Sequence, residues 1–255
     1  MNKVILISID GMRPDGFLSC GNPYIHELMA KGSYTLDART VFPSVTLPCH
    51  MSMFHSVTPE RHGITTNIFI PLARPLNGLF EQIKLFGGKC AMFYGWEPLR
   101  DIYRPGSVQF ATFQYHATVP AVDGVLTELA LERIAQSKPD FVFLYMPEVD
   151  EVGHAQGWMT PPYLEHISAA ISNVRRVVES VGQEYTVIVT ADHGGHDRTH
   201  GTTMPEDMTI PMFFIGPDFT PGQKLENVSM LDIAPTITDV LGILPAPEWE
   251  GKSLK

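Results

Sequence analysis

The feature that most constrains the fold is a set of short apolar runs separated by longer amphipathic stretches. These runs contain many β-branched and aromatic residues and no charged ones, which is typical of buried strands. They are Val4–Ile9, Phe141–Met146, Thr186–Thr190 and Met212–Ile215, with Cys90–Tyr94 as a weaker candidate. Strands that alternate with helices predict a three-layer α/β/α fold with a mostly parallel central sheet.

Helical patterns occupy the stretches between these runs. The predicted helices are Tyr24–Lys31, Leu76–Phe86, Val122–Gln136, Pro162–Val181 and Leu231–Leu241. The pattern is clearest in the fourth of them, where apolar residues recur on one helical face and charged residues on the other. No internal repeat is evident, so we expect one catalytic domain over residues 1–255.

The composition narrows the possible partners. The chain has 255 residues, of which 44% are hydrophobic and 18% charged, so it can bury a sizeable core and is not expected to be disordered. Its formal net charge of −10 argues against a nucleic-acid polymer as partner. A phosphate substrate stays compatible with this charge, because carboxylates that hold divalent cations reverse the sign of the local field.

The cysteines and the apolar segments bear on the compartment. Cys20, Cys49 and Cys90 are too few and too widely spaced for a disulfide framework. The apolar start of the chain, residues 1–10, resembles a strand rather than a cleaved signal peptide, and no apolar run reaches the ~18 residues of a membrane span. We therefore expect a cytoplasmic protein without a membrane partner. The sequence indicates no oligomeric state.

Carboxylates follow three of the predicted strands. Asp10, Asp150 and Asp192 each come at or just after a strand's end. Because the carboxyl ends of parallel strands meet at one edge of a sheet, and ligands bind beyond that edge, these side chains are expected to converge.

Imidazoles accompany the same carboxylates. His154 follows Asp150 by four residues, His193 is next to Asp192, and His200 lies further on. Three Asp and three His suit two zinc sites, and manganese is credible because carboxylates accept it readily. Two such ions can clamp the attacking and leaving oxygens of a phosphoryl displacement. The alternative is a set of surface pairs and turn residues, and the convergence of the side chains favours metal.

Six ordered segments resemble a known family. They are Ile7–Gly11, Phe42–His50, His62–Asn67, Asp150–His154, Thr190–Gly194 and Thr199–Gly201, and the tail Trp249–Leu254 is similar as well. Nearly end to end, the chain resembles the alkaline phosphatase superfamily, and within it the type I phosphodiesterase/nucleotide pyrophosphatase branch. The resemblance implies an alkaline-phosphatase-like fold.

The resemblance also implies residue roles. The ligands of one metal would be Asp150, His154 and His200, and those of the other would be Asp10, Asp192 and His193. Thr46 would be the nucleophile that forms a phospho-threonine intermediate. Asn67 would hold a non-bridging phosphate oxygen. Tyr145 lies where some diesterases place an aromatic ring near the substrate.

Elementary chemistry is consistent with the role of Thr46. A threonine hydroxyl is a poor nucleophile near neutral pH, and metal coordination is one way to activate it. Pro48 suits the first turn of a helix, so Thr46 is expected at a helix N-terminus, where phosphate is favoured. The structural alternatives are a helix cap for Thr46 and a turn residue for Asn67. His196 is expected to hydrogen-bond to a metal ligand.

These observations predict a two-metal hydrolase of small phosphate esters, with a nucleotide as one candidate substrate. A diesterase or nucleotide pyrophosphatase is favoured by Thr46, by Asn67 and by the lack of an obvious arginine beside the nucleophile. A phosphomonoesterase or phosphonate hydrolase on the same scaffold is the alternative, and a non-catalytic metal-binding module is a remote one. A sulfatase is disfavoured, since its nucleophile derives from Cys or Ser.

The range 68–122 is the only room for a substrate-covering element. It is rich in aromatic residues and contains turn signals such as Gly95-Trp96-Glu97-Pro98, so it is a candidate for a small, loop-rich cap or flap. Its aromatic side chains could stack on a nucleobase or form a local core, and the sequence favours the core.

Overall fold

The central element is a twisted seven-stranded sheet. The structure, a computed structural model, describes residues 2–72 and 74–255, and within them the strand order is β2-β7-β6-β1-β5-β3-β4. The strands are β1 Val4–Ile9, β2 Ser33–Arg39, β3 Cys90–Tyr94, β4 Phe110–Phe113, β5 Phe141–Met146, β6 Thr186–Thr190 and β7 Thr209–Ile215. Only β7 runs antiparallel to its neighbours, β6 and β2, so the prediction of a mostly parallel sheet is confirmed.

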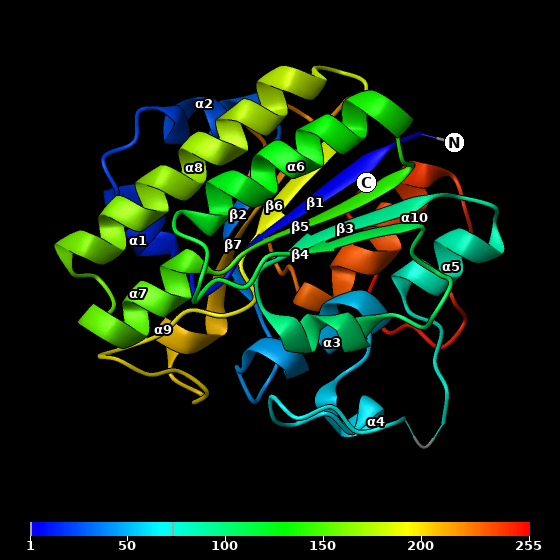
Figure 1. Ribbon diagram of the computed structural model, residues 1–255, viewed down its shortest axis with the longest axis horizontal. Coiled ribbons are helices and arrows are strands. Elements are labelled where there is room, and N and C mark those ends of the chain that lie inside the picture. Colours follow the sequence, from blue (N-terminus) through cyan, green and yellow to red (C-terminus); the bar gives the residue numbers. More distant parts are fainter. Residues whose placement is uncertain (1, 73) are drawn as a thin grey trace.

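Helices cover both faces of the sheet (Figure 1). One layer contains α1 Pro14–Ser19, α2 Tyr24–Lys31, α6 Val122–Ser137, α7 Glu148–Gln156 and α8 Pro161–Val181. The other contains α3 Thr46–His55, α5 Leu79–Leu85 and α10 Ile233–Leu241, with α4 Pro59–His62 next to α3. Shorter elements are α9 Pro205–Met208 and the 3₁₀ turns η1 Glu97–Ile102 and η2 Met230–Asp232. Within the described ranges, none of the helices combines the length and the apolar character needed to cross a bilayer.

The core explains which strands the sequence revealed. Every residue of β1, β3, β5 and β6 is buried, because helices cover these strands on both faces, and such strands are continuous apolar runs. All five predicted strands are present. The edge strands β2 and β4 were not predicted. Each has residues that are not buried, and β4 has only four residues.

The range 68–122 is not a separate cap over its full length. Two of its segments, β3 and β4, belong to the central sheet, and α5 packs against β3. Phe93 and Tyr94 are buried in β3, as the local-core interpretation predicted. Among the described residues of this range, those without regular secondary structure lie in segments that connect these elements, mainly at 68–72, 74–78 and between η1 and β4.

Candidate active site

The structure brings the six predicted ligands together as two groups at the carboxyl edge of the sheet. Within each group, one possible ligand atom per residue lies within 4.8 Å of the others. We call Asp10, Asp192 and His193 the buried group, and Asp150, His154 and His200 the open group. The convergence predicted from the strand ends is therefore confirmed.

The buried group is built on the ends of two neighbouring strands. Asp10 follows β1 directly, and Asp192 and His193 come just after β6. His193 Nε2 lies 3.3 Å from Asp10 Oδ1 and 3.4 Å from Asp192 Oδ2. The backbone N–H groups of Gly11 and His193 donate to Asp192 Oδ1, at 3.2 and 2.9 Å, and so fix that carboxylate.

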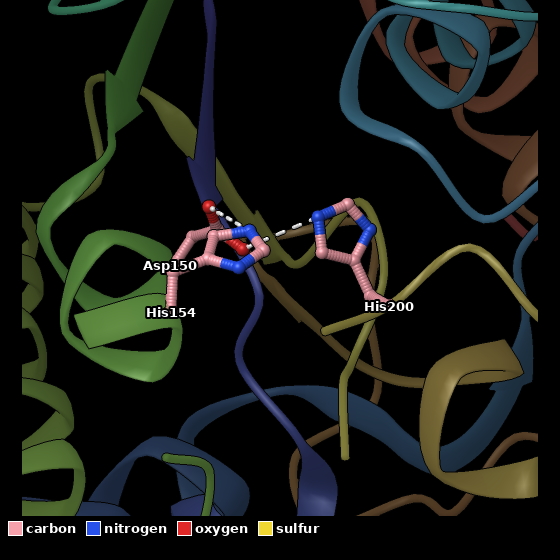
Figure 2. A group of neighbouring side chains, drawn as sticks. All are labelled: Asp150, His154 and His200. Carbon is pink, nitrogen blue, oxygen red and sulfur yellow. Dashed lines mark ion pairs between the residues drawn. The ribbon is translucent and has the colours of Figure 1, made fainter. Parts of the chain in front are cut away.

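The open group is built on a helix and a loop. Asp150 and His154 lie one turn apart on α7, so their side chains share a face, and His200 approaches from the loop before α9 (Figure 2). Asp150 Oδ2 lies 3.4 Å from His154 Nε2, and Asp150 Oδ1 lies 3.7 Å from His200 Nε2. The side chain of His154 is 43% exposed, so this group faces solvent.

The two groups adjoin each other. The rings of His193 and His200 are stacked, with centroids 3.8 Å apart and planes 14° apart. Gly11 has φ +69°, and a Cβ there would lie 3.0 Å from Asp150 Oδ1. A glycine is needed at this turn because the backbone is left-handed and Asp150 approaches it closely.

All three histidines present the same nitrogen to the site. Each Nδ1 lies within hydrogen-bond distance of a backbone carbonyl: His193 to Gly194 at 2.8 Å, His154 to Arg198 at 3.0 Å, and His200 to Ser44 at 2.8 Å. A carbonyl oxygen can only accept, so each Nδ1 carries the proton and each Nε2 presents a lone pair. This arrangement is the usual one for metal-binding imidazoles.

The carboxylates also suit a cation. Asp10 Oδ1, Asp150 Oδ1 and Asp192 Oδ2 are buried and have no hydrogen-bond partner within the described part of the chain. These are the same oxygens that face an imidazole Nε2. An acceptor facing an acceptor in a buried site is costly, and a divalent ion between them would satisfy both. The residues present therefore fit two divalent metal ions.

Burial shifts the titration of both kinds of ligand. It raises the pKa of Asp192 to about 7, and it raises those of Asp10 and Asp150 well above their usual range. It lowers the pKa of His200 to about 3, with a further contribution from His193. Without a metal ion, burial therefore favours the protonated form of these carboxyl groups and the neutral form of the His200 imidazole.

Thr46, the predicted nucleophile, lies next to the buried group. It is the first residue of α3, it is buried, and its Oγ1 lies 3.3 Å from His193 Nε2. Its own backbone N–H has no hydrogen-bond partner among the described residues. The hydroxyl thus sits next to the buried group at the positive end of a helix dipole.

Asn67 lies beside Thr46 and is exposed. Its Oδ1 accepts a hydrogen bond of 3.0 Å from the backbone N–H of Leu47, the second residue of α3. This bond fixes the amide orientation and leaves the Nδ2 hydrogens free to donate.

Tyr145 does not lie where a stacking residue would be. It is only 1% exposed, and its hydroxyl donates a hydrogen bond to Asp10 Oδ2. A ring with so little exposure is not available to a substrate. The position instead suits orientation of the Asp10 carboxylate.

Two other histidines differ from the simplest expectations. His196 Nδ1 lies 2.8 Å from Asp207, not from a predicted metal ligand. His50, expected only to pack, donates from Nδ1 to the Thr46 carbonyl at 2.8 Å and accepts from Ser8 at Nε2, so it ties α3 to β1.

Aromatic residues at the end of β4 lie near the site and were not predicted from the sequence. Phe113 and Tyr115 are exposed, and their ring centroids lie 6.1 Å apart. The next residue, His116, lies 3.1 Å from Glu151, which is adjacent to Asp150 on α7. No local pattern marks these residues, because their place beside α7 depends on the pairing of β4 in the sheet.

The family is identified by comparison with known sequences. Residues 4–204 match the family described as type I phosphodiesterase/nucleotide pyrophosphatase. This match covers most of the chain, so the chain belongs to this family, a branch of the alkaline phosphatase superfamily. The expected family resemblance is confirmed.

The curated relatives have low sequence identity to this chain and are much longer than it. Ectonucleotide pyrophosphatase/phosphodiesterase family member 3 of Mus musculus is 25% identical over 215 residues, which cover 75% of this chain and 24% of the relative. Venom phosphodiesterase of Macrovipera lebetinus is 27% identical over 221 residues, which cover 76% of this chain and 25% of the relative. The chain thus spans about a quarter of the length of these relatives.

Solved structures share the fold. An inactive variant of murine ectonucleotide pyrophosphatase/phosphodiesterase 5 in complex with AMP superposes with a TM-score of 0.83 at 16% identity, covering 99% of this chain and 98% of that one. A phosphonate monoester hydrolase from Silicibacter pomeroyi gives a TM-score of 0.78 at 14% identity, covering 100% and 76%. The alkaline-phosphatase-like fold is therefore confirmed.

Proposed function

We propose that this chain hydrolyses small phosphate diesters with two divalent metal ions and Thr46 as covalent nucleophile. The observation that carries the proposal is the pairing of partnerless carboxylate oxygens with imidazole Nε2 atoms next to the Thr46 hydroxyl. Family membership supports phosphoester hydrolysis as the reaction class.

The six ligands would divide as the two groups do. The buried group would hold one ion and the open group the other, with zinc favoured by the mixed Asp and His donors and manganese as the second choice. The bound ions would supply positive charge for the attacking and leaving oxygens and would lower the pKa of oxygens bound to them.

The chain's own residues would then perform a two-step displacement. Thr46 Oγ1 attacks phosphorus, so a Thr46 Oγ–P bond forms while the bond to the leaving oxygen breaks, and the hydroxyl proton of Thr46 passes through solvent to the leaving alkoxide. Water next attacks the phospho-threonine, which breaks the Oγ–P bond and restores the hydroxyl. The free N–H of Thr46 and the Nδ2 hydrogens of Asn67 would donate to the phosphoryl oxygens as their negative charge grows.

The charges around Thr46 favour a diester over a monoester. In the described part of the chain, no lysine or arginine side chain hydrogen-bonds or ion-pairs with Thr46, Asn67 or the six predicted ligands. A monoester dianion carries an additional charge that would lack a fixed cationic partner here. A nucleotide diester or pyrophosphate is the first substrate class to test, since a structural neighbour is described in complex with AMP.

The test compares bis-p-nitrophenyl phosphate with p-nitrophenyl phosphate, using the zinc-loaded protein. We expect the diester to react faster, and we expect Thr46→Ala to abolish the reaction while both metals stay bound. A preference for the monoester would contradict the diesterase proposal and favour the phosphatase or phosphonate hydrolase alternative. Turnover that survives in Thr46→Ala would contradict the covalent step.

A further inference from the structure

Trp158 contacts the chain on both sides of the candidate metal centre. It lies in the short connection between α7 and α8 and is almost fully buried. Its indole Nε1–H donates to the carbonyl of Gly11 at 2.9 Å, and its backbone N–H donates to the carbonyl of Asp197 at 2.8 Å. Gly11 follows Asp10 directly, and Asp197 lies in the loop that runs from His193 to His200. One residue is therefore hydrogen-bonded to two segments that carry predicted ligands.

The indole ring also packs against the two imidazoles of the open group. Its centroid lies 5.1 Å from that of His154 at an interplanar angle of 87°, and 6.0 Å from that of His200 at 63°. Edge-to-face contacts at these distances are favourable and directional, so they select the ring orientations of both histidines.

Two glycines create the space for the indole. A Cβ on Gly153 would lie 2.7 Å from the ring of Trp158, and a Cβ on Gly195 would lie 2.2 Å from it. The ring therefore packs directly on the backbone of α7, next to His154, and on the backbone of the loop after His193. Any side chain at either glycine would displace the indole.

We propose that Trp158 is a positioning residue that holds His154 and His200 in the orientation needed to bind a metal ion. This inference rests on the proposed function only in that it assumes a metal ion in the open group. The buried group depends less on Trp158, because its members are fixed by β1, β6 and their own backbone hydrogen bonds.

The contacts predict a ranked effect. The Gly11 carbonyl also accepts a 2.8 Å hydrogen bond from the Tyr163 hydroxyl, so loss of the indole N–H alone leaves that carbonyl paired. Trp158→Phe keeps an aromatic ring against the histidines and should lower the zinc affinity of the open group by about 10-fold. Trp158→Ala removes the ring and should lower that affinity by about 100-fold. The zinc affinity of the buried group should change little in either variant.

Trp249 offers a matched control. Its indole Nε1–H also donates to a backbone carbonyl at 2.9 Å, that of Asn77, but it contacts neither group. Trp249→Phe should leave both zinc affinities unchanged. The chain has 3 tryptophans, so combining Trp96→Phe with Trp249→Phe leaves Trp158 as the only indole fluorophore.

The experiment is a zinc titration of the metal-free 255-residue chain against a chromophoric chelator, with Trp158 emission recorded in the single-tryptophan variant. We expect two zinc ions to bind, Trp158 emission to change only with the weaker one, and that weaker affinity to fall in the order wild type, Trp158→Phe, Trp158→Ala. Circular dichroism checks that each variant is folded. If Trp158→Ala does not fold, the comparison of wild type with Trp158→Phe is sufficient to test the inference.

Three results would overturn the inference. The first is two unchanged zinc affinities in Trp158→Phe and in any folded Trp158→Ala. The second is Trp158 emission that does not respond while two zinc ions bind. The third, a wild-type chain that takes up no zinc, would overturn the proposed function as well. Two zinc ions with the expected ranking but no diester hydrolysis would support the role of Trp158 and contradict only the proposed function.

Discussion

The buried group and the open group contain the same kinds of side chain but stand on different parts of the fold. The buried group follows two neighbouring central strands, and its side chains have almost no contact with solvent. The open group stands on a helix and a loop, and the side chain of His154 is partly exposed to solvent. Strand ends in the middle of a sheet are held by pairing on both sides, whereas a helix and a loop are held by side-chain packing.

This difference indicates that the two groups have different roles. The Thr46 hydroxyl contacts the buried group, so the better fixed of the two groups lies next to the proposed nucleophile. The open group is nearer to solvent, where the leaving alkoxide and the incoming water of the proposed reaction would pass. We therefore expect the buried group to bind its ion more tightly and to exchange it more slowly.

The largest effect is expected at the nucleophile. Thr46→Ala should lower kcat for bis-p-nitrophenyl phosphate by on the order of 10⁴-fold, since the covalent step is lost, while zinc content stays at two ions. Thr65→Ala is a matched control, because Thr65 is exposed and nearby in the chain. A residual rate within a factor of ten of wild type would show that Thr46 is not the nucleophile.

The next effect compares one ligand from each group. His193→Ala should weaken the tighter zinc ion by more than ~100-fold and His154→Ala should weaken the other ion, because loss of a direct ligand exceeds the usual effect of an outer partner. Calorimetric titration of both variants with zinc separates the two. If His154→Ala weakened the tighter ion instead, the assignment of tight and weak sites would be reversed.

The pH dependence of the metal-free protein tests the buried carboxylates. The pKa of Asp192 is raised to about 7 by burial, so below pH 7 the folded protein keeps a proton that the unfolded chain releases above about pH 4. Asp192 therefore destabilises the metal-free protein increasingly as pH rises toward 7. Asp192→Asn removes this cost, so its stability relative to wild type should rise between pH 5 and 7, at a slope of at most about 1.4 kcal/mol per pH unit that decreases as the pH approaches 7.

The comparison with Asp192→Asn is needed because His50 and His200 titrate in the opposite sense. Burial lowers the pKa of each to about 3, so both stabilise the folded protein less as pH falls below their usual value of 6.5. Urea unfolding of both proteins in a chelator, at pH 5 and at pH 8, isolates the Asp192 contribution. With zinc added the sign should invert, because the cation binds the ionised carboxylate. An Asp192→Asn variant that is no more stable at pH 8 without metal would contradict the account.

The smallest effect is expected at Tyr145. Tyr145→Phe removes the hydrogen bond to Asp10 and should lower the zinc affinity of the buried group by about 10-fold, with the open group unchanged. Tyr185→Phe serves as control, since its hydroxyl donates to the Pro139 carbonyl away from the site. A change in KM for diesters with no change in zinc affinity would instead support a substrate-binding role for Tyr145.

The same contrast explains what the sequence could predict. The buried central strands are apolar throughout, and the chain reaches Asp10 and Asp192 directly after β1 and β6 and Asp150 on α7, just beyond β5. The convergence of these three carboxylates therefore followed from local pattern and sheet geometry. The edge strands β2 and β4 are only partly buried and lack that pattern. Their positions are determined by pairing with β7 and β3, which local sequence does not encode.

The residues of the candidate site that lie in short motifs could be predicted from the sequence. Those whose role depends on contacts between distant parts of the chain could not. The six predicted ligands and Thr46, the predicted nucleophile, lie in recognisable segments. The hydrogen bond from Trp158 to Gly11 joins residues 147 positions apart, and the one from Tyr145 to Asp10 joins residues 135 positions apart. The orientation of both side chains therefore depends on the assembled fold. The sequence suggested a stacking role for Tyr145 because it could not show that the ring is buried and its hydroxyl bonded to Asp10.

The most direct test of the proposed two-metal site is a crystal structure of the zinc-loaded protein with anomalous scattering recorded at the zinc edge. We expect two peaks ~3.5–4 Å apart, one within about 2.0–2.2 Å of donor atoms of the buried group and one equally close to those of the open group. The Thr46 hydroxyl should lie nearest the first peak. A single peak, or none between these side chains, would contradict the proposed two-metal site.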